Sequence, residues 1–243
     1  MKNILALLAF LPAVAFASTG GVQLEHAPIN LYDKASLQRG AAIFVNHCLN
    51  CHSASAMRYA RLQDLGMSEQ QIRDNVMLSA DKIGETMTAA ADPAVFKAAF
   101  GVVPPDLSLV GRSRGPDWLY SYLRAFYRDP NSKTGWNNTV FPNVAMPHVL
   151  WEYQGDQRLD VTERRDESSG DMKVTTKLAL DTPGRLTRVQ YDEYVADLVN
   201  YLTYMGEPAQ TDRKFWGILA LFLLSAFAVV ALMLKNEYWN DVK

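Results

Sequence analysis

The residues whose spacing could do chemistry are the chain's two cysteines, which are followed at once by a histidine. They form the run Cys48-Leu49-Asn50-Cys51-His52. C-x-x-C-H is an attachment motif for c-type haem. The two thiols bond to the two vinyl groups on one edge of the macrocycle, and the adjacent histidine coordinates the iron from one face. We therefore predict one covalent haem c, attached at Cys48 and Cys51 and ligated by His52.

Other uses of a cysteine pair fit this sequence less well. A thioredoxin-like pair needs a βαβ pattern around it, which is not found here. A structural zinc site needs four ligands, and the chain has no second Cys/His pair. A disulfide framework would need more cysteines at wider spacing. His47 precedes Cys48, but its side chain is expected to point away from the iron.

A second axial ligand must come from elsewhere in the chain, and an electron-transfer haem uses methionine or histidine. Met146 stands in Asn143-Val144-Ala145-Met146-Pro147-His148, a proline-flanked loop that could present a thioether to the iron. The residues alone leave Met146 and His148 as candidates. Four other methionines are interpreted as core filler: Met57, Met77, Met87 and Met205.

The N-terminus has the pattern of a secretory signal peptide. Lys2 precedes an apolar run over residues 4–16, which ends at Ala15-Phe16-Ala17. A positive start, a short apolar core and an A-x-A site predict a signal peptide over 1–17, cleaved after Ala17.

A second apolar segment, over 215–234, carries no charge and matches the about 20 residues that cross a bilayer. Trp216 lies near one end, and Tyr238 and Trp239 lie beyond the other, as in an aromatic belt. We predict a transmembrane anchor over 213–235 and a cytoplasmic tail over 236–243. Flanking Lys and Arg are balanced, so the orientation follows from the signal peptide, which exports residues 18–212.

The exported part has ordinary globular composition. The whole chain is 49% hydrophobic and 21% charged, with a formal net charge of −2. This charge gives no support for a nucleic-acid-binding surface. Four segments have helical patterns. The first covers 37–46, and the second follows the Ser68/Gln71 capping box. The third runs from Pro116 to a stop at Asp129-Pro130, and the fourth from the Thr187/Gln190 capping box to Met205.

Between these helical patterns, residues 130–155 read as loop. Residues 156–177 are strongly polar and are expected to form an exposed hairpin or a mobile insertion. The predicted fold is therefore a mainly α haem domain of cytochrome c type with long loops, followed by one C-terminal transmembrane helix.

Several runs resemble one known family: cytochrome c1, the haem subunit of the quinol:cytochrome c reductase (cytochrome bc1) complex, in its bacterial form. The resemblance rests on five features: Leu37-Gln38-Arg39-Gly40 ahead of the cysteine motif, Pro104-Pro105-Asp106-Leu107-Ser108 with Arg112 and Arg114, Phe141-Pro142 ahead of Met146-Pro147, Glu207-Pro208 with Arg213-Lys214, and the single C-terminal span.

The resemblance implies that Met146 is the sixth ligand. It also implies that an arginine after Pro-Pro-Asp-Leu-Ser supports a haem propionate, and counting from the motif favours Arg114 over Arg112. Pro104 and Pro105 would wall the pocket. Two aromatic residues would line the haem edge or be ordinary core residues: Tyr59 and Trp118.

The function implied is electron transfer. The family accepts electrons from the Rieske iron–sulfur protein and passes them to a cytochrome c, in a dimeric membrane complex with cytochrome b. Such a chain is a redox subunit with no catalytic site of its own. Two alternatives are a membrane-anchored c-type cytochrome that serves a terminal oxidase, and a haem enzyme or sensor with an open sixth position.

Overall fold

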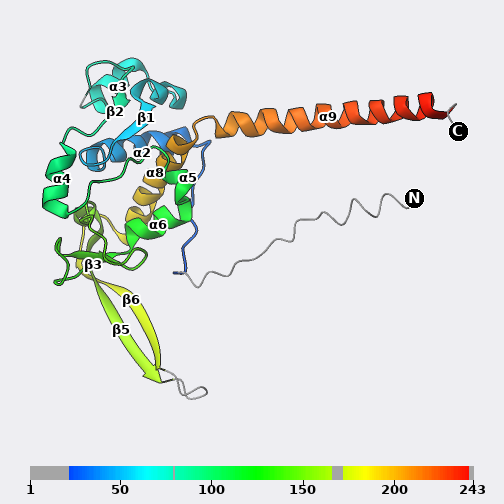
Figure 1. Ribbon diagram of the computed structural model, residues 1–243. Helices are drawn as coiled ribbons and strands as arrows, with labels where there is room; N and C mark the ends of the chain where they lie inside the picture. The colour runs from blue at the N-terminus through cyan, green and yellow to red at the C-terminus, as the bar shows by residue number, and fades with distance from the viewer. Residues whose placement is uncertain (1–21, 79, 166–171, 241–243) are drawn as a thin grey trace.

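The computed structural model describes residues 22–78, 80–165 and 172–240, so the predicted signal peptide lies outside the described residues. Figure 1 shows a helical body from which two elements project: a β-hairpin and a long C-terminal helix. In chain order the elements are α2 (Lys34–His47), β1 (Ala54–Arg58), the 3-10 helix η2 (Tyr59–Leu65), α3 (Glu69–Asn75), β2 (Thr86–Met87), α4 (Pro93–Phe100), α5 (Val110–Ser113), α6 (Pro116–Arg124), β3 (Phe126–Arg128), β4 (Trp136–Asn138), α7 (Trp151–Gln154), β5 (Gly155–Arg165), β6 (Met172–Pro183), α8 (Arg188–Gly206) and α9 (Gln210–Trp239).

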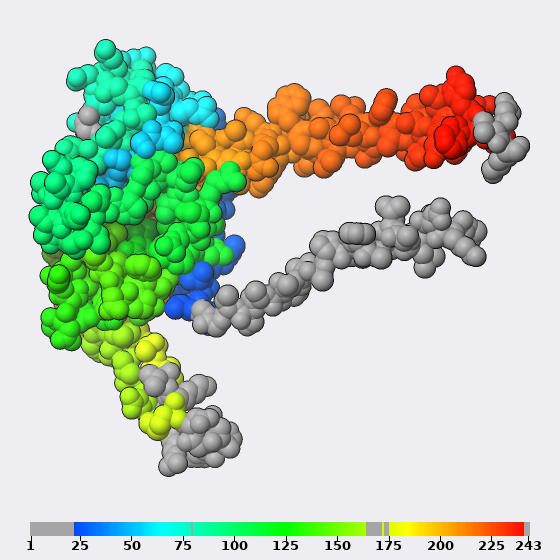
Figure 2. All heavy atoms as spheres, in the orientation of Figure 1, coloured from blue at the N-terminus to red at the C-terminus, as the bar shows by residue number. Residues whose placement is uncertain are grey.

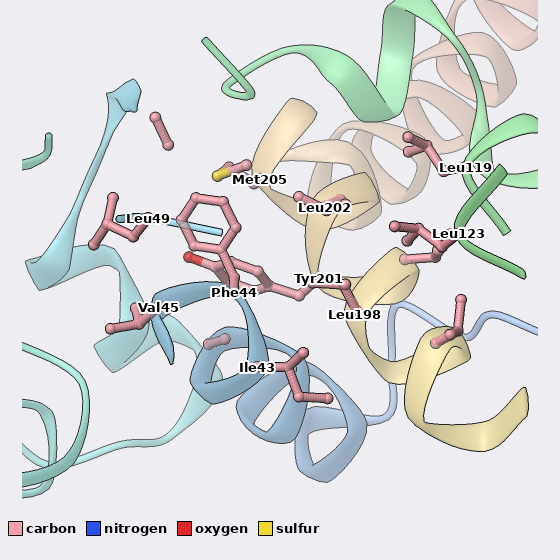
Figure 3. Close-up of a cluster of buried hydrophobic side chains, with 14 of the residues drawn as sticks. Ile43, Phe44, Val45, Leu49, Leu119, Leu123, Leu198, Tyr201, Leu202 and Met205 are labelled. Carbon is pink, nitrogen blue, oxygen red and sulfur yellow. The ribbon is translucent and has the colours of Figure 1, made fainter. Parts of the chain in front are cut away.

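Helices α2 and α8 pack against each other at the centre of the body. The ring centroids of Phe44 and Tyr201 lie 5.7 Å apart, and Figure 3 shows these rings among apolar side chains from both helices. At Gly40 a Cβ atom would lie 2.7 Å from Tyr201 Cβ and would also meet the Asp197 carbonyl oxygen. The helices therefore approach this closely only because residue 40 is glycine.

A polar contact at the rim fixes the same pair of helices. Arg39 donates to both carboxylate oxygens of Asp197, with N–O distances of 2.6 and 2.9 Å. The fork geometry of guanidinium and carboxylate sets the rotation of α2 against α8. Because α2 leads directly into the cysteine motif, this packing also holds the motif in place.

Both predicted capping boxes are confirmed. At α3, Ser68 Oγ accepts from the Gln71 N–H and Gln71 Oε1 accepts from the Ser68 N–H. At α8, Thr187 and Gln190 exchange the same two bonds. The helical pattern expected up to Met205 is confirmed by α8, which buries an apolar face: Val195, Leu198, Val199, Leu202 and Met205.

The helix that begins at Pro116 ends earlier than the apolar pattern predicted. It stops at Arg124, and Phe126–Arg128 forms β3, which pairs with β4. The Asn138 side chain donates to the Tyr122 carbonyl oxygen at 2.8 Å, and the Gln157 amide donates to the Phe126 carbonyl oxygen at 2.9 Å. Side chains from outside α6 thus satisfy two carbonyl oxygens at and beyond the end of the helix.

The segment expected to be loop over 130–155 contains two short elements, β4 and α7. The polar segment that follows forms the antiparallel hairpin β5–β6, with pairs running from Gly155↔Pro183 to Arg165↔Met172. Figure 1 shows this hairpin projecting from the body. It extends beyond the expected 156–177 at its C-terminal end because residues 178–183 pair with the first strand.

Helix α9 contains the predicted anchor and is longer than it. It has 30 residues, and its most apolar window has a mean hydropathy of 2.7 with no residue buried. At about 1.5 Å per residue it spans roughly 45 Å, more than the about 30 Å of a hydrocarbon core. Figure 2 shows that it stands clear of the body. A helix exposed and apolar on all sides is a candidate membrane span rather than a core helix.

Candidate haem site

The cysteine motif forms a tight turn at the end of α2. Cys48 caps the helix, and the N–H groups of Cys51 and His52 both donate to its carbonyl oxygen, at 3.1 and 2.8 Å. Both thiols are free and half-buried. Burial raises the pKa of the Cys48 thiol to about 12 and also raises that of Cys51. The thiols are therefore neutral, whereas a redox-active C-x-x-C pair has a lowered thiol pKa.

The imidazole of His52 is oriented by a backbone carbonyl. Its Nδ1 lies 2.8 Å from the carbonyl oxygen of Pro105. A carbonyl oxygen only accepts, so Nδ1 carries the proton and Nε2 keeps its lone pair. Burial, opposed by this hydrogen bond, lowers the pKa of His52, which favours the neutral ring. A neutral imidazole whose second nitrogen is fixed by a hydrogen bond is the usual form of a histidine ligand to a metal.

The Pro105 carbonyl reaches His52 because its segment is bonded to the chain that follows the motif. Asp106 Oδ2 accepts from the N–H and the hydroxyl of Ser55, at 2.9 and 2.7 Å, and Asp106 Oδ1 accepts from the Ser108 N–H at 2.8 Å. These bonds outweigh the effect of burial and lower the pKa of Asp106. The Asp-x-Ser spacing was a sequence signal for this local turn, but it did not show the link to Ser55.

A second strap joins the same two segments. The Leu107 N–H donates to the Ser53 carbonyl oxygen at 2.8 Å, and Ser108 Oγ accepts from the Ala56 N–H at 3.0 Å. The run singled out in the sequence, Pro104-Pro105-Asp106-Leu107-Ser108, therefore runs alongside residues 53–56. It acts as the support for the His52 ring.

Met146 belongs to a group of side chains gathered by α6. Its Sδ accepts a hydrogen bond from the Tyr122 hydroxyl at 3.4 Å. Tyr122 stacks on Trp118 with a centroid separation of 4.8 Å, and the Arg114 guanidinium lies 4.9 Å from the Trp118 ring centre. The structure thus brings Arg114, Trp118 and Met146 together through Tyr122, a residue that no sequence motif had singled out.

Two asparagines hold the loop that carries Met146. Asn138 is 1% exposed, and its Oδ1 accepts from the N–H groups of Val140 and Phe141, at 2.9 and 3.1 Å. Asn137 Oδ1 accepts from the Asn143 N–H at 2.8 Å. Asn143 has φ 61°, a left-handed conformation that asparagine tolerates better than most residues. These contacts were not predictable from the sequence, in which residues 130–155 read only as loop.

Other predicted site residues lie elsewhere. Tyr59 is fully buried in the core at the start of η2. Arg112 pairs with Glu207, with an N–O distance of 3.3 Å, at the end of α8. His148 is 2% exposed, and its ring stacks on Phe126 with centroids 4.7 Å apart. Burial lowers the pKa of His148 to about 4, so this ring is neutral.

Comparison with known proteins agrees with this geometry. The sequence profile of the Cytochrome C1 family matches residues 25–176, more than half of the chain. The chain belongs to the cytochrome c1 family.

Two known proteins match nearly the whole length of this cytochrome c1 family member. It is 46% identical over 242 residues to the ammonia monooxygenase gamma subunit of Nitrosomonas europaea, covering 100% of this chain and 98% of that protein. It is 45% identical over 243 residues to cytochrome c1 of Allochromatium vinosum, covering 99% of each. Cytochrome c1 of Rhodospirillum rubrum is 27% identical over 264 residues.

The residues of this cytochrome c1 family member fit a covalent haem. The two thiols are free, neutral and three positions apart on one turn. His52 offers a free Nε2, and Met146 offers a half-buried thioether. Two thiols, one imidazole and one thioether are the donor set of a His/Met-ligated c-type haem.

Proposed function

We propose that this chain is the cytochrome c1 subunit of a quinol:cytochrome c oxidoreductase. In this role it takes electrons from the Rieske iron–sulfur protein and passes them to a cytochrome c acceptor. Membership of the cytochrome c1 family supports an electron-transfer subunit. The observation that carries the proposal is the bond from His52 Nδ1 to the Pro105 carbonyl oxygen, because it leaves Nε2 free for a metal.

One haem c would be held by this chain through thioether bonds at Cys48 and Cys51. When bound, it supplies an iron that carries one electron at a time. His52 and Met146 would fill the two axial positions, and methionine ligation favours a higher reduction potential than a second histidine. With both positions filled by protein side chains, the iron would keep no open position for a substrate, which separates this role from a haem enzyme or sensor.

The geometry favours Arg114 for the haem propionate. Arg112 is already paired with Glu207. Arg114 contacts the rings of Trp118 and Phe141, and among the described residues no carboxylate partner of Arg114 is found. A guanidinium beside the Met146 group and without an acidic partner is suited to a propionate, which needs a charge-assisted hydrogen bond when it is half-buried.

The haem attachment has a direct test. In a denaturing gel stained for haem peroxidase activity, the unaltered protein should keep its haem, and the double variant Cys48→Ala/Cys51→Ala should keep none. Asn50→Ala is the matched control, since it changes the motif between the two thiols and preserves both. Haem retention by the double variant would contradict covalent attachment at these positions.

The membrane setting is part of the same proposal. Helix α9 would anchor the chain in a bacterial inner membrane by a single span, with the haem domain in the periplasm and the C-terminus in the cytoplasm. Cytochrome b, the Rieske protein and the cytochrome c acceptor would be its partners, in a dimeric complex. Purification from membranes in mild detergent should recover cytochrome b and the Rieske protein with this chain, and their consistent absence would contradict the assignment.

A second candidate comes from one relative. The Nitrosomonas europaea protein that is 46% identical over 242 residues is named as a gamma subunit of ammonia monooxygenase. This chain would then serve a monooxygenase complex instead. The same purification distinguishes the two roles, since monooxygenase subunits would be recovered in place of cytochrome b and the Rieske protein.

A further inference from the structure

A cleft of about 590 Å³ lies where the body meets the start of α9. It is lined by residues 29–32, by α5, by the end of α8 and by the first turns of α9. Figure 1 shows the N-terminal segment in blue and α5 in green beside the first turns of α9. This cleft lies at the end of the body nearest to the candidate membrane span.

Positive charge gathers in this cleft. Arg213 donates to Glu207 at 2.6 Å, and Arg112 lies 3.3 Å from the other oxygen of the same carboxylate. Lys214 also lines the cleft. The bond from Arg213, together with the charges of Arg112 and Lys214, lowers the pKa of Glu207, so this carboxylate is ionised. Three cations face one lining carboxylate, which leaves two positive charges uncompensated.

Close packing of α5 on α8 places Arg112 in the cleft. A Cβ atom at Gly111 would lie 2.7 Å from Thr203 Cα and would also meet the Leu202 carbonyl oxygen, so only glycine permits this approach. At Gly206, a Cβ atom would lie 3.2 Å from Arg112 Cγ. The arginine stem therefore rests against the last turn of α8. Because the backbone of α5 is held here, the cleft does not depend on the rotamer of Arg112 alone.

The position of the cleft along α9 indicates the chemistry of its ligand. Immediately after Lys214 the helix becomes apolar, with Phe215 and Trp216 65% and 63% exposed. Tyr32, at the rim of the cleft, is 74% exposed. Aromatic residues gather at the level of lipid headgroups. If α9 spans the membrane, the cations of the cleft lie at the depth of the phospholipid phosphates.

We propose that this cleft binds the phosphodiester headgroup of an acidic phospholipid, through Arg112, Arg213 and Lys214. Guanidinium groups bind phosphate oxygens bidentately, and an ammonium group adds a point charge. A phosphodiester carries one negative charge, which the excess charge of the cleft accommodates. The inference rests on α9 being the membrane anchor in the proposed function, but not on the identity of the redox partners.

The test measures lipid binding by the full-length, haem-loaded chain in detergent, by native mass spectrometry with phosphatidylglycerol and phosphatidylcholine. The unaltered protein should prefer phosphatidylglycerol. Each charge removed, in Arg213→Gln or Lys214→Gln, should weaken phosphatidylglycerol binding about fivefold. Glu207→Gln should strengthen it, because it frees two arginines. Lys97→Gln on α4 is the matched control and should leave binding unchanged.

Three results would overturn the inference. The first is equal binding of phosphatidylglycerol and phosphatidylcholine. The second is a loss of phosphatidylglycerol binding in Lys97→Gln as large as that in Arg213→Gln. The third is weaker binding in Glu207→Gln when its haem spectrum and helical content are preserved. Competition by inorganic phosphate at equal concentration would identify a site for free phosphate instead of a lipid. A chain recovered from the soluble fraction would instead contradict the membrane anchor of the proposed function, so the two failures are distinguishable.

Discussion

At the scale of single residues, the candidate site is defined by what orients each donor atom. His52 is held by the Pro105 carbonyl at 2.8 Å, and Met146 Sδ accepts from the Tyr122 hydroxyl at 3.4 Å. The five residues of the cysteine motif were sufficient to predict the cofactor and one axial ligand. They could not predict the contact with Pro105 or the role of Tyr122, because both residues lie more than 50 positions after the motif in the sequence.

Tyr122→Phe tests the contact at Met146. Removing the hydroxyl deletes the hydrogen bond to Sδ and leaves the ring stacked on Trp118. A donor to the thioether weakens its donation to ferric iron, so its loss should lower the reduction potential. A hydrogen bond of about 0.5–1.5 kcal/mol corresponds to a shift of roughly 20–60 mV for one electron. A redox titration measures the shift.

Tyr120→Phe is the control for that titration. Tyr120 lies on the same helix and is also buried, but its ring contacts the Arg124 guanidinium at 4.4 Å. The reduction potential of the Tyr120→Phe variant should equal that of the unaltered protein. Equal shifts in the two variants would show that the Met146 contact has no special effect.

At the scale of elements, the capped helices and the hairpin β5–β6 were predictable, whereas the short pair β3–β4 was not. The capping boxes at Ser68 and Thr187 are local signals, and both were confirmed. The predicted end of α6 was wrong. The helix stops at Arg124, Phe126 pairs with Asn138 in β3–β4, and the side-chain amides of Asn138 and Gln157 donate to the carbonyl oxygens of Tyr122 and Phe126. Strands of three residues are too short to show an alternating pattern in one sequence.

Asn138→Ala tests the support of the Met146 loop. It removes three hydrogen bonds at a side chain that is 1% exposed and leaves the buried Tyr122 carbonyl oxygen without that donor. We expect a loss of about 2–3 kcal/mol in the free energy of unfolding, with a rise in high-spin haem as the loop loosens. Asn131→Ala, at an exposed turn, is the control for chemical denaturation and absorption spectra. An unchanged spin state in Asn138→Ala would show that the loop does not need this support.

Gly40→Ala tests the contact between α2 and α8. Alanine favours an isolated helix by about 1 kcal/mol over glycine. Here the new methyl group would meet the Asp197 carbonyl oxygen and Tyr201 Cβ, and overpacking costs about 1–3 kcal/mol or more when backbone atoms cannot move. The melting temperature should therefore fall. Gly84→Ala, with open space around it, is the control, and equal melting temperatures would contradict the packing argument.

At the scale of the whole molecule, the fold is a helical body that carries the candidate haem site and continues into one long apolar helix. The sequence predicted this division, because residues 215–234 form an unbroken run of twenty uncharged residues. It did not predict that the helix would continue to Trp239 or that a charged cleft would form at its base, because the cleft joins residues from four separate segments.

The proposed topology predicts an asymmetric protease result. In spheroplasts carrying the chain with a C-terminal epitope tag, added protease should degrade the haem domain and leave a tagged fragment of the anchor protected inside. Disrupting the membrane should then expose the tag as well. A haem domain that survives in intact spheroplasts and is degraded only after disruption would place the haem on the cytoplasmic side and contradict the proposed orientation.

The central claim, a His52/Met146-ligated electron-transfer haem, is tested most directly by Met146→Leu with absorption spectra and a redox titration. The unaltered ferric protein should be low-spin with a weak near-infrared sulfur-to-iron band. The variant should lose that band, bind carbon monoxide when reduced, and have a lower potential. A variant that stays low-spin, with the band and the potential unchanged, would contradict Met146 as the sixth ligand.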